Sequence, residues 1–346
     1  MSLAVPFDVK GWCPGGRRPM PSGDGLLVRV RPWCGAFSLD QAKGLAEIAA
    51  TLGNGHIDLT RRANLQIRGL REQDLPALHQ ALDRLGLLEN EAARNIMIDP
   101  LAGPETRALA TALGRALPQD MPAKFGGLVD GGGPLSIVGE RADIALAITD
   151  EGVAVRVDGE WLGVTPLEHA VAAALGDRRW LSTMTVMPTA GARRLGRLGS
   201  FTGLAAPFGR LEAQQLRDLS VSCADAGGSQ IRLSPRRALY IDAAIDGATF
   251  IVDESDPLLR IEACPGAPAC SSATVDTRAT ARRLAAMNLA GTIHVSGCAK
   301  GCARSAPADL VLVGQAGRYG VVRDGTARDA ATRIVAPDEL VSLLDG

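Results

Sequence analysis

The sequence predicts an α+β fold with two ferredoxin-like halves, related by a pseudo-two-fold axis and interleaved with α/β lobes. Three observations lead to this prediction. Residues 37–67 align without a gap on residues 211–241 at a constant offset of 174, with nine identical pairs. Both copies show the apolar period of a helix followed by two short alternating strands. In each copy a glycine ends the helix, and an arginine-containing turn joins the two strands.

The first half, residues 18–72, includes the alternating segment Leu26–Val30, which predicts a strand ahead of a turn at Pro32. Residues 73–195 follow as the first expected α/β lobe. The expected helices of this lobe are Leu75–Leu85 and Glu105–Leu113, and the expected strands are Asn95–Ile98, Ile144–Thr149 and Val153–Val157.

The second half, residues 196–245, begins with a glycine-rich segment, Gly199–Ala206, which precedes a turn at Pro207. Residues 246–346 form the second expected α/β lobe, with a helix at Thr277–Met287 and strands at Thr292–Val295 and Leu310–Val313. Length alone, at roughly 150 residues per domain, suggests about two domains. The duplication favours one pseudo-symmetric body instead.

Composition excludes several classes of partner. The chain carries 37 basic and 38 acidic residues, a net charge of −1, which is not the basic footprint of a nucleic-acid-binding protein. No apolar stretch approaches the roughly 20 residues of a membrane span. The N-terminus lacks the pattern of a signal peptide, so we expect a cytoplasmic protein. Only four of the basic residues are lysines, a bias that codon composition can explain except where an arginine has a specific ligand.

The turn and strand after the first helix carry a polar pattern. Alternation after Arg62 places Asn64, Gln66 and Arg68 on one strand face, whereas the second copy has Ala238 and Tyr240 at the first two of these positions. A solvated strand face would also explain the pattern. The difference between the copies favours a ligand at the first copy and a partner surface at the second.

The cysteines of the last segment point to a metal centre. Four of the seven cysteines fall there in two pairs, Cys264-x5-Cys270 and Cys298-x3-Cys302, within loops rich in Gly and Pro. Two such pairs can hold a [4Fe–4S] cluster, whereas structural zinc more often uses closer knuckles. For Cys13, Cys34 and Cys223 we expect ordinary packing as small apolar residues.

Five segments in order resemble the sulfite/nitrite reductase superfamily, whose members bind sirohaem beside a [4Fe–4S] cluster. The cysteine pattern and the duplication are both similar to that family. So are TRRANLQIRG (60–69), Arg94-Asn95 followed by DPLAG (99–103), and MPAKF (121–125). The matches run from about residue 24 to residue 305.

The resemblance implies a set of site residues. Arg62, Arg94 and Lys124 would face the tetrapyrrole in catalytic positions. Contacts to the macrocycle or support for its pocket would come from Asn64, Gln66, Arg68 and Asn95. The cluster ligands would be Cys264, Cys270, Cys298 and Cys302, and the last would also bridge to haem iron in the reductases.

Two departures distinguish this chain within the superfamily. The family often has a second lysine two residues after the first, as K-F-K, where this chain has Gly126. The glutamine that follows the motif arginine is replaced by Ala63. The segments Cys13–Arg29 and Gly53–Gly69 are most similar to a branch that hydroxylates precorrin-3A with dioxygen and closes a γ-lactone in aerobic cobalamin biosynthesis.

The resemblance therefore implies an oxidoreductase, a mono-oxygenase that takes a precorrin-type tetrapyrrole and dioxygen as substrates and a [4Fe–4S] cluster as cofactor. Mononuclear iron and sirohaem are further cofactor candidates. The sequence has no nucleotide-binding glycine motif, so electrons would come from an external donor, an NADH-linked reductase or a ferredoxin. Two alternatives stay open: a sirohaem-dependent sulfite or nitrite reductase, and a non-catalytic iron–sulfur protein that transfers electrons or binds tetrapyrroles.

Overall fold

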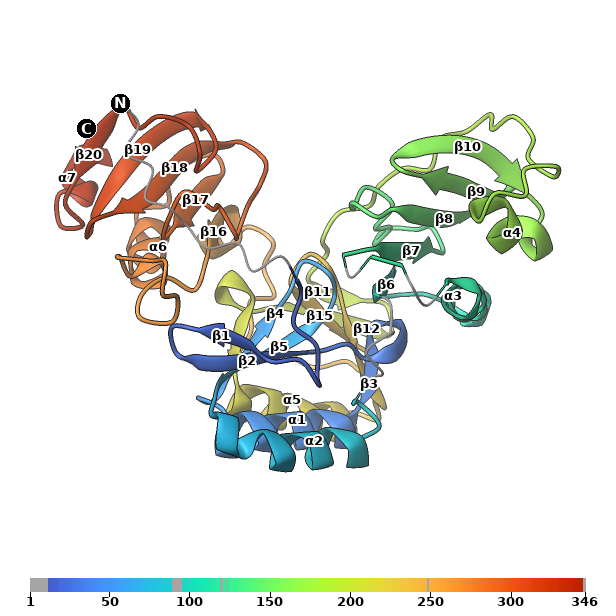
Figure 1. The fold of residues 1–346 in the computed structure, drawn as a ribbon, viewed down its shortest axis with the longest axis horizontal. Helices are drawn as coiled ribbons and strands as arrows, with labels where there is room; N and C mark the ends of the chain where they lie inside the picture. Colours follow the sequence, from blue (N-terminus) through green and yellow to red (C-terminus); the bar gives the residue numbers. More distant parts are fainter. Residues whose placement is uncertain (1–11, 89–94, 119–120, 123, 248, 345–346) are drawn as a thin grey trace. The chain divides into compact units, whose positions relative to one another are not determined.

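The computed structural model describes residues 12–88, 95–118, 121–122, 124–247 and 249–344 (Figure 1). The chain forms two compact units. The larger comprises residues 12–19 and 28–252, and the smaller comprises residues 20–27 and the chain from residue 253 onward. In the part of the chain that is described, no helix is long and apolar enough to span a membrane.

The duplication is confirmed element by element in the larger unit. The first copy contains η1 (Trp33–Gly35), β3 (Ala36–Ser38), α1 (Leu39–Thr51), β4 (His56–Leu59) and β5 (Leu65–Leu70). The second contains η4 (Pro207–Gly209), β13 (Arg210–Glu212), α5 (Ala213–Asp225), β14 (Gln230–Leu233) and β15 (Ala238–Ile241). From η1 to β4 every element has its counterpart at an offset of 174. Helices α1 and α5 pack side by side beneath the strands (Figure 1).

The helices of the two copies begin in the same way. Ser38 caps α1 with a capping box in which its hydroxyl accepts from the Gln41 amide and the Gln41 side chain accepts from the Ser38 amide. Glu212 and Gln215 form the equivalent box at α5. A capping box satisfies two of the amides that a helix start leaves unpaired. The repeated glutamine of the sequence therefore marks the start of each helix.

The two halves exchange their edge strands. Strands of the first half follow the order β2-β5-β4-β13, where β2 is Gly25–Val30, and β13 comes from the second copy. The sheet of the second half has the order β11-β12-β15-β14-β3, with β11 at Gly196–Leu198, β12 at Phe201–Ala205 and β3 from the first copy. Both exchanged strands pair antiparallel with their hosts. The sequence repeat predicted the pseudo-symmetry but not this exchange.

A five-stranded sheet follows the first half in the larger unit, with the order β10-β9-β8-β7-β6. Its members are β6 (Asn95–Ile98), β7 (Gly126–Asp130), β8 (Ile144–Thr149), β9 (Gly152–Val157) and β10 (Glu160–Thr165). Strands β6, β7 and β8 are parallel, and the others antiparallel. Helices α3 (Pro104–Ala116) and α4 (Ala170–Ala174) and the 3₁₀ turn η3 (Leu167–His169) complete this region. Helix α2 (Leu75–Arg84), preceded by the 3₁₀ turn η2 (Glu72–Asp74), packs instead against α1 of the first half (Figure 1).

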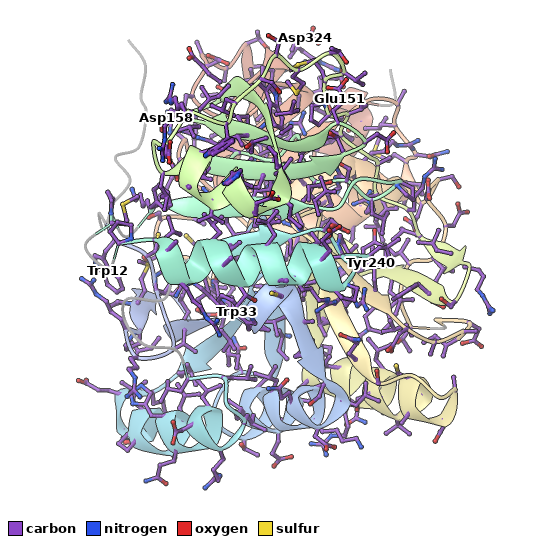
Figure 2. All side chains as sticks on the ribbon, turned by 90° about the vertical axis from the view of Figure 1, so that its right-hand side faces the viewer. Trp12, Trp33, Glu151, Asp158, Tyr240 and Asp324 are labelled. Carbon is purple, nitrogen blue, oxygen red and sulfur yellow. The ribbon has the colours of Figure 1, made fainter. Side chains whose placement is uncertain are left out.

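An apolar core and a tryptophan from the first half pack against this region. Apolar side chains of α3, β7, β8, β9 and α4 form a continuous core over one of its faces. The Trp33 ring from the first half reaches α3, where a Cβ added at Gly114 would lie 2.7 Å from Trp33 Cη2 (Figure 2). The predicted strands Asn95–Ile98 and Ile144–Thr149 are confirmed with the same bounds, and the predicted helices within a few residues.

The smaller unit holds a second mixed sheet, with the order β16-β17-β18-β19-β20. Its strands are β16 (Ile261–Ala263), β17 (Ile293–Ser296), β18 (Ala308–Gln315), β19 (Arg318–Gly325) and β20 (Arg333–Val335). The helices are α6 (Thr277–Ala286) and α7 (Leu340–Leu344), with the 3₁₀ turn η5 (Pro257–Arg260). Strand β1 (Met20–Ser22) pairs antiparallel with the start of β2, and the Ser22 hydroxyl donates to the Ala269 carbonyl at 2.9 Å.

Candidate functional site

The polar face predicted for the first copy is present on β5. Leu65 and Ile67 point into the core, and Gln66 stands directly opposite Asp58 of β4. Asn64 is 3% exposed, and its Nδ2 has no hydrogen-bond partner among the described residues. A buried amide without a partner costs free energy unless a ligand or water satisfies it. Asn64 is therefore suited to contact a ligand.

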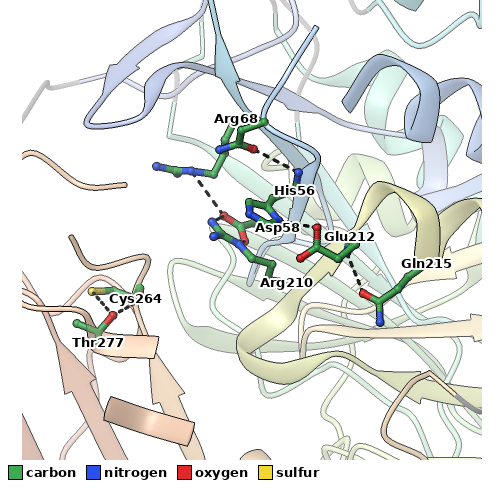
Figure 3. A network of polar contacts seen from close by, with 9 residues as sticks. His56, Asp58, Arg68, Arg210, Glu212, Gln215, Cys264 and Thr277 are labelled. Carbon is green, nitrogen blue, oxygen red and sulfur yellow. Dashed lines mark hydrogen bonds and ion pairs between the residues drawn. The ribbon is translucent and has the colours of Figure 1, made fainter. Parts of the chain in front are cut away.

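Arg68 is held by an internal carboxylate. Asp58 lies between two arginines: Arg210 of the exchanged strand donates from Nε to Oδ1 at 2.8 Å and from Nη2 to Oδ2 at 3.1 Å. Arg68 Nε lies 3.9 Å from Asp58 Oδ2 (Figure 3). The Arg68 side chain is almost fully buried. Of the two roles that the resemblance implied for Arg68, this arrangement fits support of the pocket.

Replacing Asp58 by Ala should destabilise the larger unit, because two largely buried guanidinium groups lose the carboxylate between them. Removing one partner of a buried ion pair typically costs about 3 kcal/mol or more. Urea unfolding monitored by circular dichroism measures the loss. Asp177→Ala, which breaks a solvent-exposed pair with Arg179, should leave the midpoint unchanged and serves as the control. An equally stable Asp58→Ala variant would show that the network carries no stability.

The corresponding face of the second copy is occupied by the chain itself. Arg232 Nη1 donates to the Pro100 carbonyl at 2.9 Å, and its guanidinium lies over the Phe201 ring. Arg236, the counterpart of Arg62, donates to the Ser136 carbonyl at 2.8 Å. The partner surface expected at the second copy is thus a contact within the larger unit.

Arg62 and Lys124 line one pocket in the larger unit, with a volume of about 340 Å³. Its described lining consists of Arg62, Pro122, Lys124, Phe125, Arg141 and Asp143. Asn95, the first residue of β6, donates from Nδ2 to the Arg62 carbonyl at 3.3 Å, which anchors the turn that carries Arg62. The structure thus brings together two of the three predicted catalytic residues. Arg94 lies outside the described residues.

Sequence reasoning missed two residues of this pocket, Arg141 and Asp143. They precede β8 in a segment without a recognisable motif. Asp143 Oδ2 accepts from the Gly126 amide at 2.7 Å, and the Asp143 amide donates to the Gly126 carbonyl at 2.9 Å. This pair of hydrogen bonds joins the starts of the neighbouring strands β7 and β8, and only the folded sheet brings them together.

Further positive charge lies near Arg62. Burial lowers the pKa of Arg29 from its ordinary value, and the guanidinium groups of Arg31 and Arg62 lower it further, against an opposing contact with Cys13. Arg29 Nε has no hydrogen-bond partner among the described residues. Like charges close together in a partly buried place favour binding of an anion, because a carboxylate relieves their repulsion.

Asp99, directly after β6, has an unusual protonation equilibrium. Burial raises its pKa to about 6, with a further contribution from Asp130, although hydrogen bonds from the amides of Gly131 and Leu101 act in the opposite direction. Because this value lies above the ordinary 3.8, the folded state holds the proton more tightly than the unfolded state. The unfolding free energy should therefore fall as the pH rises from about 4 to about 6, and then level off.

The Asp99→Asn variant isolates this effect, since an amide does not titrate. We expect the wild type to lose roughly 2–3 kcal/mol more than the variant between pH 4 and pH 7. Denaturant unfolding at the two pH values measures the difference. Parallel pH profiles for the two proteins would contradict the raised pKa.

The two loops that carry the paired cysteines begin at the same end of the sheet in the smaller unit. Strands β16 and β17 are parallel, with Ala263 opposite Val295, so their carboxyl ends meet. Cys264 follows β16 directly, and Cys298 follows β17 after one intervening glycine, Gly297. The two cysteine loops therefore begin side by side.

Local geometry around these thiols suits a cluster. The Gly297 amide donates to Cys264 Sγ at 3.1 Å, the kind of hydrogen bond that tunes a cluster thiolate. Gly266 and Gly301, one in each loop, have φ values of +68° and +65°, which favour glycine. Cys302 is exposed to solvent, but the protein atoms around its thiol and the other three thiols raise its pKa, whereas Lys300 lowers it. The four sulfurs thus lie close enough to affect one another.

Four cysteine thiols are the donor set that a [4Fe–4S] cluster uses. Within the described ranges, no group of three or more His, Cys, Asp or Glu side chains is arranged to hold one metal ion. A [4Fe–4S] cluster distributes four thiolates over four irons, so its ligands need not converge on one point. Cys264, Cys270, Cys298 and Cys302 would hold the cluster, and the bound cluster would pass single electrons.

Comparisons with known proteins agree with this architecture. The family model of the nitrite/sulfite reductase ferredoxin-like half domain matches residues 18–85. A precorrin-3B synthase from Sinorhizobium sp. is 31% identical over 92% of this chain and 83% of its own length. A ferredoxin–nitrite reductase from Synechococcus elongatus is 24% identical over 86% of this chain and 77% of its own length. The solved structure of Mycobacterium tuberculosis NirA has a TM-score of 0.69 at 19% identity, covers 92% of this chain and 79% of that one, and confirms the predicted fold.

Proposed function

The chain belongs to the precorrin-3B synthase family within the nitrite and sulfite reductase superfamily, and we propose that it hydroxylates precorrin-3A with dioxygen and closes a γ-lactone. The chain is an oxidoreductase, as its relatives are. The observation that supports this choice of substrate is the pocket that both Arg62 and Lys124 line. A precorrin bears many acetate and propionate carboxylates, which guanidinium and ammonium groups bind through charge-assisted hydrogen bonds.

The electron balance of the proposed reaction requires a donor. One oxygen atom enters the substrate and the other leaves as water, which consumes two electrons and two protons. A [4Fe–4S] cluster at the four cysteines would deliver the electrons singly. An external carrier, an NADH-linked reductase or a ferredoxin, would resupply them. A mononuclear iron is a further candidate for the centre that meets dioxygen, whereas a bound sirohaem would belong to the reductase alternative below.

The residues of the larger unit have separate roles in this proposal. Arg62 and Lys124 bind carboxylates at the edge of the macrocycle, and Arg94 is proposed to act with them. Asn64 and Gln66 contact the macrocycle from β5. Arg68, held by Asp58, supports that face, and Asn95 holds the Arg62 turn in place.

A sirohaem-dependent sulfite or nitrite reductase is the second candidate, supported by the nitrite reductase relative at 24% identity. Gly126 favours the first candidate, because the family's second anion-binding lysine is missing there. A non-catalytic electron-transfer protein would have no need of a cationic pocket, so we place it third.

The absorption spectrum of anaerobically purified protein tests the choice. We expect a broad cluster band and no stoichiometric sirohaem, together with oxygen-dependent conversion of precorrin-3A. A full complement of sirohaem with turnover of sulfite would contradict the proposed mono-oxygenase. A cluster spectrum without any conversion of precorrin-3A would favour the electron-transfer protein.

A further inference from the structure

Gly126 is a glycine that its own backbone does not require. It is the first residue of β7 and pairs in parallel register with Asn95 of β6. Its φ does not lie in the left-handed region, which glycine is usually needed to adopt. In strands, glycine is generally disfavoured relative to residues that have a side chain. A specific neighbour must therefore account for it.

That neighbour is the Arg62 guanidinium. A Cβ added at Gly126 would lie 2.6 Å from Arg62 Nη1, closer than real Cβ contacts come. The next nearest atoms, the Asn95 carbonyl oxygen at 3.5 Å and Arg62 Cζ at 3.6 Å, are at ordinary contact distances. The end of one side chain is thus the sole close obstacle among the described atoms, and it occupies the space that a side chain at residue 126 would fill.

The backbone on both sides of this contact is held in place. Asp143 fixes Gly126 through its carboxylate and its amide, and Asn95 fixes the Arg62 turn through the Arg62 carbonyl. The guanidinium lies in the pocket that Lys124 and Arg141 also line. Three cationic side chains thus share a space of about 340 Å³, enough for a carboxylate-bearing substituent but not for a whole macrocycle.

We propose that Gly126 is a specificity-determining residue, because its missing side chain lets Arg62 share the pocket with Lys124 and Arg141 and bind one carboxylate of the macrocycle. This inference rests on the proposed function, and it assigns to Gly126 the choice of ligand class at that pocket. A lysine at residue 126, as in the K-F-K pattern, would occupy the space of the guanidinium. Position 126 would thus set the ligand class: a lysine there would favour a small inorganic anion, and a glycine would favour a carboxylate of the substrate.

The test uses the full-length protein and the stable polycarboxylate macrocycle uroporphyrin III as a probe, with affinity measured by fluorescence titration. Gly126→Ala should weaken binding roughly tenfold, because the displaced guanidinium loses its alignment with the carboxylate. Gly126→Lys should weaken it further. In an Arg62→Leu background the Gly126→Ala change should have no additional effect, since the group on which it acts is gone.

The outcomes separate this inference from the proposed function. Unchanged affinity in Gly126→Ala, alongside a clear loss in Arg62→Leu, would overturn the inference and leave the carboxylate pocket intact. An equal loss from Gly126→Ala in both backgrounds would also overturn it, because the change would then act through the fold. Unchanged affinity in Arg62→Leu would contradict the proposed pocket itself. Thermal unfolding of each variant distinguishes a local effect from a general loss of structure.

Discussion

A Cys302→Ala variant should lose most of its iron and acid-labile sulfide, even when it is purified under anaerobic conditions. Four thiolates hold a [4Fe–4S] cluster, and loss of one leaves an iron without a protein ligand. Cys302 lies in the loop that follows β17, and this loop begins beside the Cys264 loop that follows β16, so we place Cys302 in the same proposed ligand set. Iron and sulfide content, together with the visible absorption of the cluster, measure the effect, and conversion of precorrin-3A should fall to background.

The matched control is Cys34→Ala. Cys34 is a half-buried free cysteine of the larger unit that packs beside the α3 core, and its removal should leave the iron content unchanged. Equal iron in Cys302→Ala and the wild type would remove Cys302 from the ligand set. Equal loss of iron in both variants would mean that cluster loss reflects general instability.

An Arg62→Leu variant should bind a polycarboxylate macrocycle roughly 30-fold more weakly than the wild type. A hydrogen bond to a charged group is worth about 2 kcal/mol, and each 1.4 kcal/mol is tenfold in affinity. Leucine keeps the apolar bulk but lacks the guanidinium that reaches Gly126 and the pocket. Equilibrium titration with uroporphyrin III measures the loss.

Arg61→Leu provides the comparison, because it removes the same charge one residue earlier. Arg61 is exposed and lies outside the described lining of the pocket. Its removal should change the affinity little, since exposed charges act weakly through water. Similar losses in both variants would indicate a diffuse electrostatic effect, and no loss in Arg62→Leu would place that arginine outside the binding site.

Much of the fold could be predicted because the sequence repeats itself. The shared offset of 174 predicted a counterpart of α1, which is α5, and a counterpart of β4, which is β14. It also predicted the pseudo-symmetry, and all three are confirmed. The exchange of β3 and β13 could not be predicted, since three-residue edge strands pair according to tertiary packing that has no local signal. The four segment boundaries, 18–72, 73–195, 196–245 and 246–346, stay a prediction.

The candidate site was predictable where a motif names the residue. Arg62 and Lys124, 62 residues apart in the chain, were assigned to one site and line one pocket. Arg141 and Asp143 carry no motif and join the pocket only through the pairing of β7 and β8. The sequence showed Gly126 as a missing lysine, whereas the structure shows that Arg62 fills the space. Side-chain positions of this kind depend on the folded backbone and not on residue spacing.

The most direct test of the central claim is single-turnover oxidation of precorrin-3A under ¹⁸O₂, with the cluster-loaded protein and a chemical or enzymatic electron donor. We predict a hydroxylated lactone product that carries one ¹⁸O atom from dioxygen, with no reduction of sulfite or nitrite by the same preparation. A product without ¹⁸O, or unaltered precorrin-3A beside reduction of sulfite or nitrite, would contradict the proposed function.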